Sequence, residues 1–273
     1  MEQTAINRED YEEPCCPFTT PDSITPIPVR RVMEKLDEYL GRNDDDAAER
    51  HLRYWLNDAV RSGDKSGQLS VLNEQIGLYR KTARETEGIA GARAALALAR
   101  QMGLEGTVTM GTTLINAATA YKAFDHAEEA MPLYREARDI YEATLSPDDS
   151  RLGGLYNNMA LTVMAFGNFA EARELFNKAM TVMEKAENGE LEMAITYCNL
   201  ADLAVAERGE TEAEAAVGES LGKALSLLNT AHLPRDGYYA FVCEKCAPVF
   251  GYYGYFSDER ELTKRAEDIY DRA

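Results

Sequence analysis

A repeat of about 42 residues limits, more than any other feature, what this 273-residue chain can fold into. Residues 155–184 laid over residues 113–142 give nine identities in thirty positions, where average composition would give roughly two. The identical pairs are Asn158 on Asn116, Ala160 on Ala118, Ala165 on Ala123, Phe166 on Phe124, Glu171 on Glu129, Ala172 on Ala130, Leu175 on Leu133, Ala179 on Ala137 and Glu184 on Glu142. Such a period predicts one supersecondary unit that recurs and packs against its own copies.

Each unit contains two helical patterns. In residues 155–166 apolar side chains recur every three or four positions, which predicts one apolar helix face. Gly167-Asn168 interrupts this pattern, and a second one follows in residues 169–183. Small alanines, such as Ala160, allow two antiparallel helices to approach closely. A single such hairpin cannot bury its apolar faces, so neighbouring hairpins must stack.

Weaker copies extend the repeat through most of the chain. We expect a single domain over residues 29–273, built from six units at about 29–64, 66–104, 107–146, 149–188, 191–232 and 237–273. Residues 1–28 are different, because they are rich in proline and show little periodicity. We expect an extended arm there, which either lies loosely across the first repeats or occupies the groove of the protein itself.

The charge balance excludes some classes of partner. The chain has 47 acidic and 29 basic residues and a formal net charge of −18, which argues against nucleic-acid binding. No apolar run approaches the ~20 residues that cross a bilayer, and the first residues do not resemble a signal peptide. Five cysteines in such a chain indicate reduced thiols. We expect a soluble, cytoplasmic protein with no membrane partner.

The stretch 155–180 resembles the tetratricopeptide repeat, in its small residues and in the Gly-Asn-Phe turn at 167–169. The period near 42 is similar to the longer variety found in kinesin light chain and many bacterial proteins. The resemblance implies an all-α, right-handed superhelical solenoid of about six helix-turn-helix repeats. Three positions depart from the pattern: Asp125 replaces the turn glycine, Gly88 replaces a small alanine, and Pro248 falls within a first helix.

The resemblance also implies a function and a site. It implies a non-enzymatic scaffold that binds a protein or peptide segment in a concave groove lined by the first helix of each repeat. Matching the motif position by position gives the candidate groove residues Asn116, Asn158, Asn199 and Lys245, flanked by Asn73 and Asn157. An amide both donates and accepts, so it can pair with the main chain of any extended peptide. The alternative is that these asparagines only bond a neighbouring helix.

Two cysteines offer a different chemistry. Cys243-x-x-Cys246 has a spacing used by zinc and redox sites, and Cys15-Cys16 could supply two further zinc ligands. However, both cysteines fall on the inward face of an expected helix, which is typical of buried thiols. The sequence shows no catalytic triad, phosphate loop or metalloprotease helix. We therefore expect no enzymatic activity, no cofactor and no metal.

The C-terminal unit is unusually aromatic over residues 237–256, which indicates either core packing or a recognition surface. Stacked repeats need a polar cap, and no extra polar helix follows Tyr270 in this sequence. We therefore expect a second copy of the chain to cover Leu262, Ala266 and Ile269 in a homodimer. Two further functions stay open beside the peptide-binding adaptor. One is a regulator that senses a peptide or small ligand, and the other is a metal- or thiol-dependent protein that uses the Cys243 and Cys246 pair.

Overall fold

Residues 24–272 are described by a computed structural model, and within this range the chain forms twelve α-helices and no β-strand. The helices are α1 (Val29–Gly41), α2 (Asp45–Ser62), α3 (Lys65–Lys81), α4 (Glu85–Gln101), α5 (Val108–Ala123), α6 (Ala127–Thr144), α7 (Ser150–Ala165), α8 (Phe169–Met183), α9 (Gly189–Arg208), α10 (Glu210–Leu228), α11 (Gly237–Tyr252) and α12 (Phe256–Tyr270). The prediction of an all-α helical-repeat solenoid is confirmed. None of the helices in this part of the chain is long and apolar enough to span a membrane.

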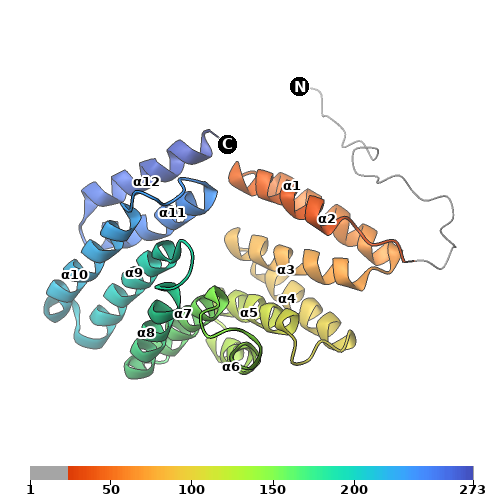
Figure 1. Cartoon of the computed structure of the whole chain (residues 1–273), viewed down its shortest axis with the longest axis horizontal. Helices are drawn as coiled ribbons and strands as arrows, with labels where there is room; N and C mark the ends of the chain where they lie inside the picture. The colour runs from red at the N-terminus through yellow and green to blue at the C-terminus, as the bar shows by residue number, and fades with distance from the viewer. Residues whose placement is uncertain (1–23, 273) are drawn as a thin grey trace.

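The helices pack as consecutive hairpins, each pairing an odd-numbered helix with the next even-numbered one. The odd-numbered helices also contact one another from α3 to α5, α7, α9 and α11, so they form the inner layer of the stack (Figure 1). The stack curves until one end of α12 comes near one end of α1 (Figure 1). A cleft of about 300 Å³ confirms this approach, since Asn43 of the α1–α2 turn lines it together with Pro248 and Tyr270 of the last hairpin.

Small residues bring the two helices of a hairpin together. Ala118, Ala160 and Ala172 are completely buried, and the large rings of Tyr134 and Phe176 fill the same place in successive repeats. Close packing of small against large side chains is what the alanine pattern requires. The buried residues form three apolar clusters, one over the first hairpins, one over the middle ones and one over the last two.

The three departures from the family pattern have local explanations. Asp125 has a φ of 62°, close to the 77° of Gly167 at the matching turn, because aspartate tolerates the left-handed region better than most residues. A Cβ on Gly88 would lie 2.8 Å from the ring of Phe124, so an alanine there would require this ring to shift. Pro248 lies inside α11 at an exposed position, and the helix continues to Tyr252.

The residues just before α1 are anchored to the second hairpin. Ile27 is buried, and its amide donates to Asp64 Oδ2 at 2.9 Å. Asp64 also caps α3 by accepting from the amide of Gly67 at 2.9 Å. A Cβ on Gly67 would lie 2.6 Å from Ile27 Cγ1, so glycine makes room for this segment. The rest of the proline-rich arm, including Cys15 and Cys16, lies outside the described residues.

Candidate binding groove

Two of the candidate asparagines join α3 to α5. Asn116 Nδ2 donates to Asn73 Oδ1 at 3.0 Å. Asn73 Nδ2 in turn lies 3.2 Å from Thr113 Oγ1 and 3.0 Å from the carbonyl of Leu69. Both asparagines are half-buried, so solvent still reaches them.

The same arrangement recurs between α7 and α9. Asn199 Nδ2 donates to Asn157 Oδ1 at 3.1 Å, and the hydroxyl of Thr196 donates to the same oxygen at 3.2 Å. Asn157 is buried, whereas Asn158 and Asn199 are half-buried. Bonding between neighbouring helices is thus present at these positions, and solvent also reaches most of the amides.

Asn158 leads to a basic cluster that the sequence analysis did not identify. Its Nδ2 donates to the carbonyl of Gly154 at 3.0 Å, and its Oδ1 accepts from Lys122 Nζ at 3.0 Å. Burial, and then repulsion from Arg80 and Lys245, lowers the pKa of Lys122 from 10.5 to about 8. These three cations come from α3, α5 and α11, so the curvature brings the second, third and sixth hairpins to one place.

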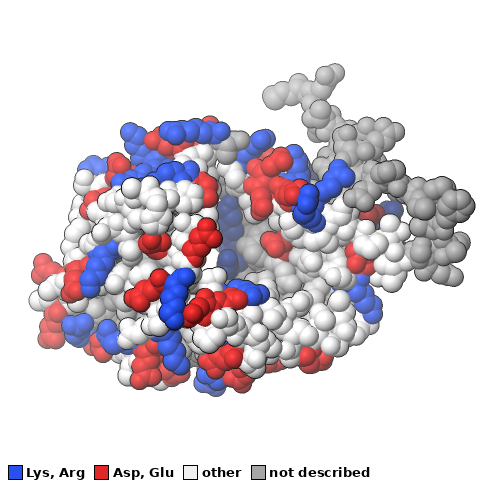
Figure 2. Space-filling view, viewed as in Figure 1, with Lys and Arg blue, Asp and Glu red and all other residues white. Residues whose placement is uncertain are grey.

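We refer to Arg80, Lys122 and Lys245 as the basic cluster. Figure 2 shows Lys and Arg atoms deep in the hollow between the two halves of the molecule, while Asp and Glu are spread over the rim and the surrounding surface. Within residues 24–272 no carboxylate forms an ion pair with any member of the cluster. Lys245 lies 5.4 Å from the centre of the Phe241 ring. A signal for two members was present in the sequence, because Arg80 and Lys122 are separated by 42 residues, one repeat period.

Carboxylates also occur on the inner helices α3 and α9. Burial, with repulsion from Asp37 of α1, raises the pKa of Glu74 on α3. Burial likewise raises the pKa of Asp202 on α9, whose carboxylate accepts from the hydroxyl of Tyr253 at 2.8 Å. The basic cluster is therefore one part of a mixed inner surface.

The cysteines of the last hairpins are buried thiols in the structure. Cys198, Cys243 and Cys246 are free and 0–3% exposed. A hydrogen bond with Cys198, followed by burial, raises the pKa of Cys246, and burial raises that of Cys243. In the described part of the chain no group of three or more potential ligands is placed to hold a metal ion. The two cysteines suggested as additional ligands, at positions 15 and 16, lie in the segment that is not described.

The expected dimer face needs a correction. Leu262 and Ala266 are buried within the chain against α11, and Ile269 is half-buried beside them, so α12 turns this stripe inward. Whether a second copy binds at this end stays a prediction, but these side chains do not offer it an exposed apolar face.

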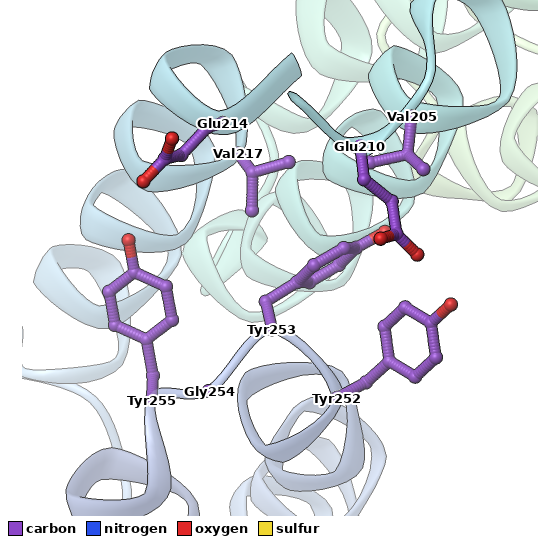
Figure 3. Close-up of a pocket in the computed structure, with 8 residues that line it drawn as sticks. All are labelled: Val205, Glu210, Glu214, Val217, Tyr252, Tyr253, Gly254 and Tyr255. Atoms are coloured by element: carbon purple, nitrogen blue, oxygen red, sulfur yellow. The ribbon is translucent and has the colours of Figure 1, made fainter. Parts of the chain in front are cut away.

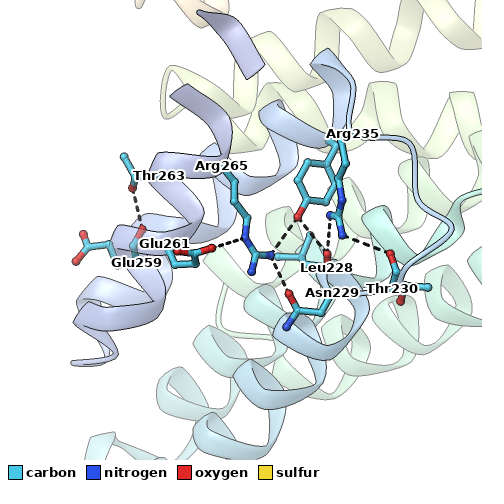
Figure 4. A network of polar contacts seen from close by, with 9 residues as sticks. Leu228, Asn229, Thr230, Arg235, Glu259, Glu261, Thr263 and Arg265 are labelled. Atoms are coloured by element: carbon cyan, nitrogen blue, oxygen red, sulfur yellow. Dashed lines mark hydrogen bonds and ion pairs between the residues drawn. The ribbon is translucent and has the colours of Figure 1, made fainter. Parts of the chain in front are cut away.

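Polar contacts also fix α12 to α11 and to the end of α10 (Figure 4). Arg265 donates to Asn229 Oδ1 at 2.8 Å and to the Tyr239 hydroxyl at 3.1 Å. The guanidinium of Arg235 lies 4.0 Å from the centre of the Tyr239 ring. In the aromatic stretch, Tyr239 and Phe250 are buried, while most other rings remain at least partly exposed.

Comparisons with known proteins agree with this architecture. Two family models, both described as tetratricopeptide repeat, match residues 111–150 and 151–231. No curated protein matches the chain by sequence. Among solved structures, BtubC (BKLC) from P. vanneervenii superposes with a TM-score of 0.62 at 20% identity, over 76% of this chain and 83% of that protein.

Two more solved structures share the fold. A putative kinesin light chain from Podospora anserina with nearly identical TPR-like repeats has a TM-score of 0.51 at 17% identity, over 74% of this chain and 94% of the other. NprR in complex with its cognate peptide NprX has a TM-score of 0.60 at 15% identity, over 88% of this chain and 66% of NprR. Residues 111–231 thus match the tetratricopeptide repeat family, and the chain shares its helical-repeat fold with proteins that include a putative kinesin light chain.

Proposed function

We propose that this protein is a non-enzymatic scaffold that binds an extended protein or peptide segment in its concave hollow. The observation that supports this most is the basic cluster. A chain with a net charge of −18 places three cations without carboxylate partners at one point of its inner surface. Burial, and then repulsion from Arg80 and Lys245, disfavours the charged form of Lys122, and a bound anion would relieve the repulsion.

The bound segment is therefore expected to carry carboxylate groups. A carboxylate forms charge-assisted hydrogen bonds with both ammonium and guanidinium groups, which are the two kinds of cation in the cluster. The half-buried amides of Asn116, Asn158 and Asn199 are then available to the main chain of the segment on either side. Likeness to NprR, whose structure holds its cognate peptide, supports a peptide as the occupant.

A second candidate is a regulator that senses such a ligand. It rests on the approach of the first and last hairpins at the cleft that Asn43 and Tyr270 line. A ligand that touches both ends of the solenoid would change their separation, and a surface contact elsewhere could report that change. A metal- or thiol-dependent function at Cys243 and Cys246 has less support, because both thiols are buried in the core. We keep the cytoplasm as the proposed location, since such thiols suit a reducing compartment.

The test uses two fluorescein-labelled peptides that differ only in charge, one containing Asp and Glu and the other Asn and Gln. We expect the acidic peptide to bind the wild-type protein, and the neutral one to bind much more weakly. In the Lys122→Gln/Lys245→Gln variant the affinity for the acidic peptide should fall at least tenfold, while Lys264→Gln, an exposed cation on α12, should lose little. Equal affinity of both peptides would reject the hollow as an anion-selective groove.

A further inference from the structure

A second cleft lies at one edge of the solenoid, outside the basic cluster. It has a volume of about 510 Å³ and forms where the α9–α10 turn meets the α11–α12 turn. Three tyrosines at the end of α11 and in the turn after it line the cleft, namely Tyr252, Tyr253 and Tyr255. Opposite them are Glu210 and Glu214 of α10 (Figure 3).

The aromatic wall is partly rigid and partly open. Tyr253 is held in place because its hydroxyl donates to Asp202 Oδ1 at 2.8 Å. The rings of Tyr252 and Tyr253 meet edge to face, with centroids 5.0 Å apart. Tyr252 nevertheless keeps 71% of its surface exposed, and Tyr255 keeps 38%. Exposed tyrosines beside a cleft are typical of recognition surfaces, since they bury much area with few rotatable bonds.

The opposite wall is acidic. Glu210 and Glu214 are four residues apart on α10, so both side chains start from the same face of the helix. Figure 3 shows Glu210 next to Tyr252 and Tyr253 and Glu214 on the side of Tyr255, with Val217 between the two glutamates. Neither glutamate forms an ion pair within residues 24–272, and the cleft has no lysine, arginine or histidine among its lining residues. A cation supplied from outside would complete the site.

We propose that this cleft binds an arginine side chain of a protein partner. A guanidinium stacks on tyrosine faces and donates to carboxylates at the same time, in a planar arrangement that an ammonium cannot reproduce. The exposed tyrosine faces provide the stacking surface, and a glutamate at either end of the cleft provides the carboxylate. This site is independent of the proposed groove. The groove lies on the inner surface and selects anions, whereas the cleft lies at the edge of the solenoid and selects a cation.

The experiment titrates the ¹⁵N-labelled full chain with an acetylated and amidated Gly-Arg-Gly-Arg-Gly peptide in 150 mM NaCl, followed by amide chemical shifts. Two further peptides replace arginine by citrulline, which has nearly the same shape without the charge, or by lysine. We expect shifts concentrated in residues 252–255 and 210–217 with the arginine peptide. The lysine peptide should bind more weakly, and the citrulline peptide should cause no saturable shifts.

Variants separate the cleft from general attraction to an acidic protein. Glu210→Gln/Glu214→Gln and Tyr252→Ala should each weaken binding about fivefold or more, whereas the exposed Glu212→Gln on the same helix should not. Melting curves check that each variant stays folded, and Lys122→Gln should leave the arginine peptide unaffected. Equal losses in Glu212→Gln, saturable binding of the citrulline peptide, or tighter binding of the lysine peptide would each overturn the proposal.

Discussion

The pKa of Lys122 makes the proposed groove testable by pH alone. Burial and the neighbouring Arg80 and Lys245 hold this pKa at about 8, below the 10.5 of a lysine in water. A base with a lowered pKa is charged below it and neutral above it, so the ammonium is ~90% populated at pH 7 and ~10% at pH 9. If the bound carboxylate requires the ammonium, the affinity should fall about tenfold between these two pH values.

Substitutions at the same position define the comparison. Lys122→Arg keeps its charge throughout this range, because a guanidinium does not lose its proton below pH 12, and its affinity should therefore stay nearly constant. Lys122→Gln should bind weakly at both pH values. A hydrogen bond with Glu85 raises the pKa of His126, so the charge of this side chain also depends on pH. It is present in all three proteins, so its effect cancels in the comparison.

The assay is fluorescence anisotropy with the acidic peptide, acetylated and free of histidine, cysteine and tyrosine, so that the peptide itself does not titrate. Calorimetry at pH 8 in two buffers of different ionisation enthalpy gives a second measure, an uptake of up to about half a proton on binding. A wild-type dissociation constant that is the same at pH 7 and pH 9, with tight binding at both, would refute the role of Lys122. So would a pH dependence of the same size in Lys122→Arg.

Three predictions concern stability. Gly111→Ala should lower the free energy of unfolding by ~1–2 kcal/mol, because its Cβ would overlap the buried ring of Tyr141. Gly154→Ala should raise this free energy by ~0.5–1 kcal/mol, because nothing lies within 4 Å of its Cβ. Urea unfolding followed by circular dichroism measures both changes, and equal effects of the two variants would contradict the packing. Asp64→Ala should lower the free energy of unfolding by ~2 kcal/mol or more, since two buried amides lose their acceptor. Asp44 caps α2 through one exposed hydrogen bond, so Asp44→Ala should lower the free energy of unfolding by about half as much in the same assay. Dialysis against EDTA should leave the melting temperature within ~1 °C, because the buried thiols are free; a drop of several degrees would show a metal that stabilises the fold.

The fold class followed from the repeat because the period and the small residues act locally. An apolar face that recurs every three or four residues needs a partner, and the nearest partner is the next helix along the chain. The turn at Asp125 illustrates the same point. The turn requires a residue with a left-handed backbone conformation at this position. Asp125 adopts the conformation that Gly167 has in the next repeat. Each of these requirements involves residues close in sequence.

The basic cluster was harder to predict because it depends on curvature. Arg80 and Lys122 share a register and were within reach of sequence reasoning. Lys245 joins them only because small rotations between successive hairpins add up until α11 faces α5. The summed rotation depends on how each pair of hairpins packs, and no short sequence motif predicts it. The same accumulation brings Asn43 to the last hairpin.

The asparagines show why a correct register does not by itself assign a role. A polar group at the boundary between two inner helices must find a hydrogen-bond partner as water is excluded. The neighbouring helix offers one at the same period as the repeat, so a periodic asparagine satisfies the helix stack and a peptide groove equally well. In this chain the side-chain amides of Asn116 and Asn199 each donate one hydrogen bond to an asparagine of the neighbouring helix. Each amide therefore keeps further donor and acceptor positions. Charge is a better guide to the binding site than amide spacing here. Bringing three cations together does not stabilise a stack of helices, but it does stabilise a bound carboxylate.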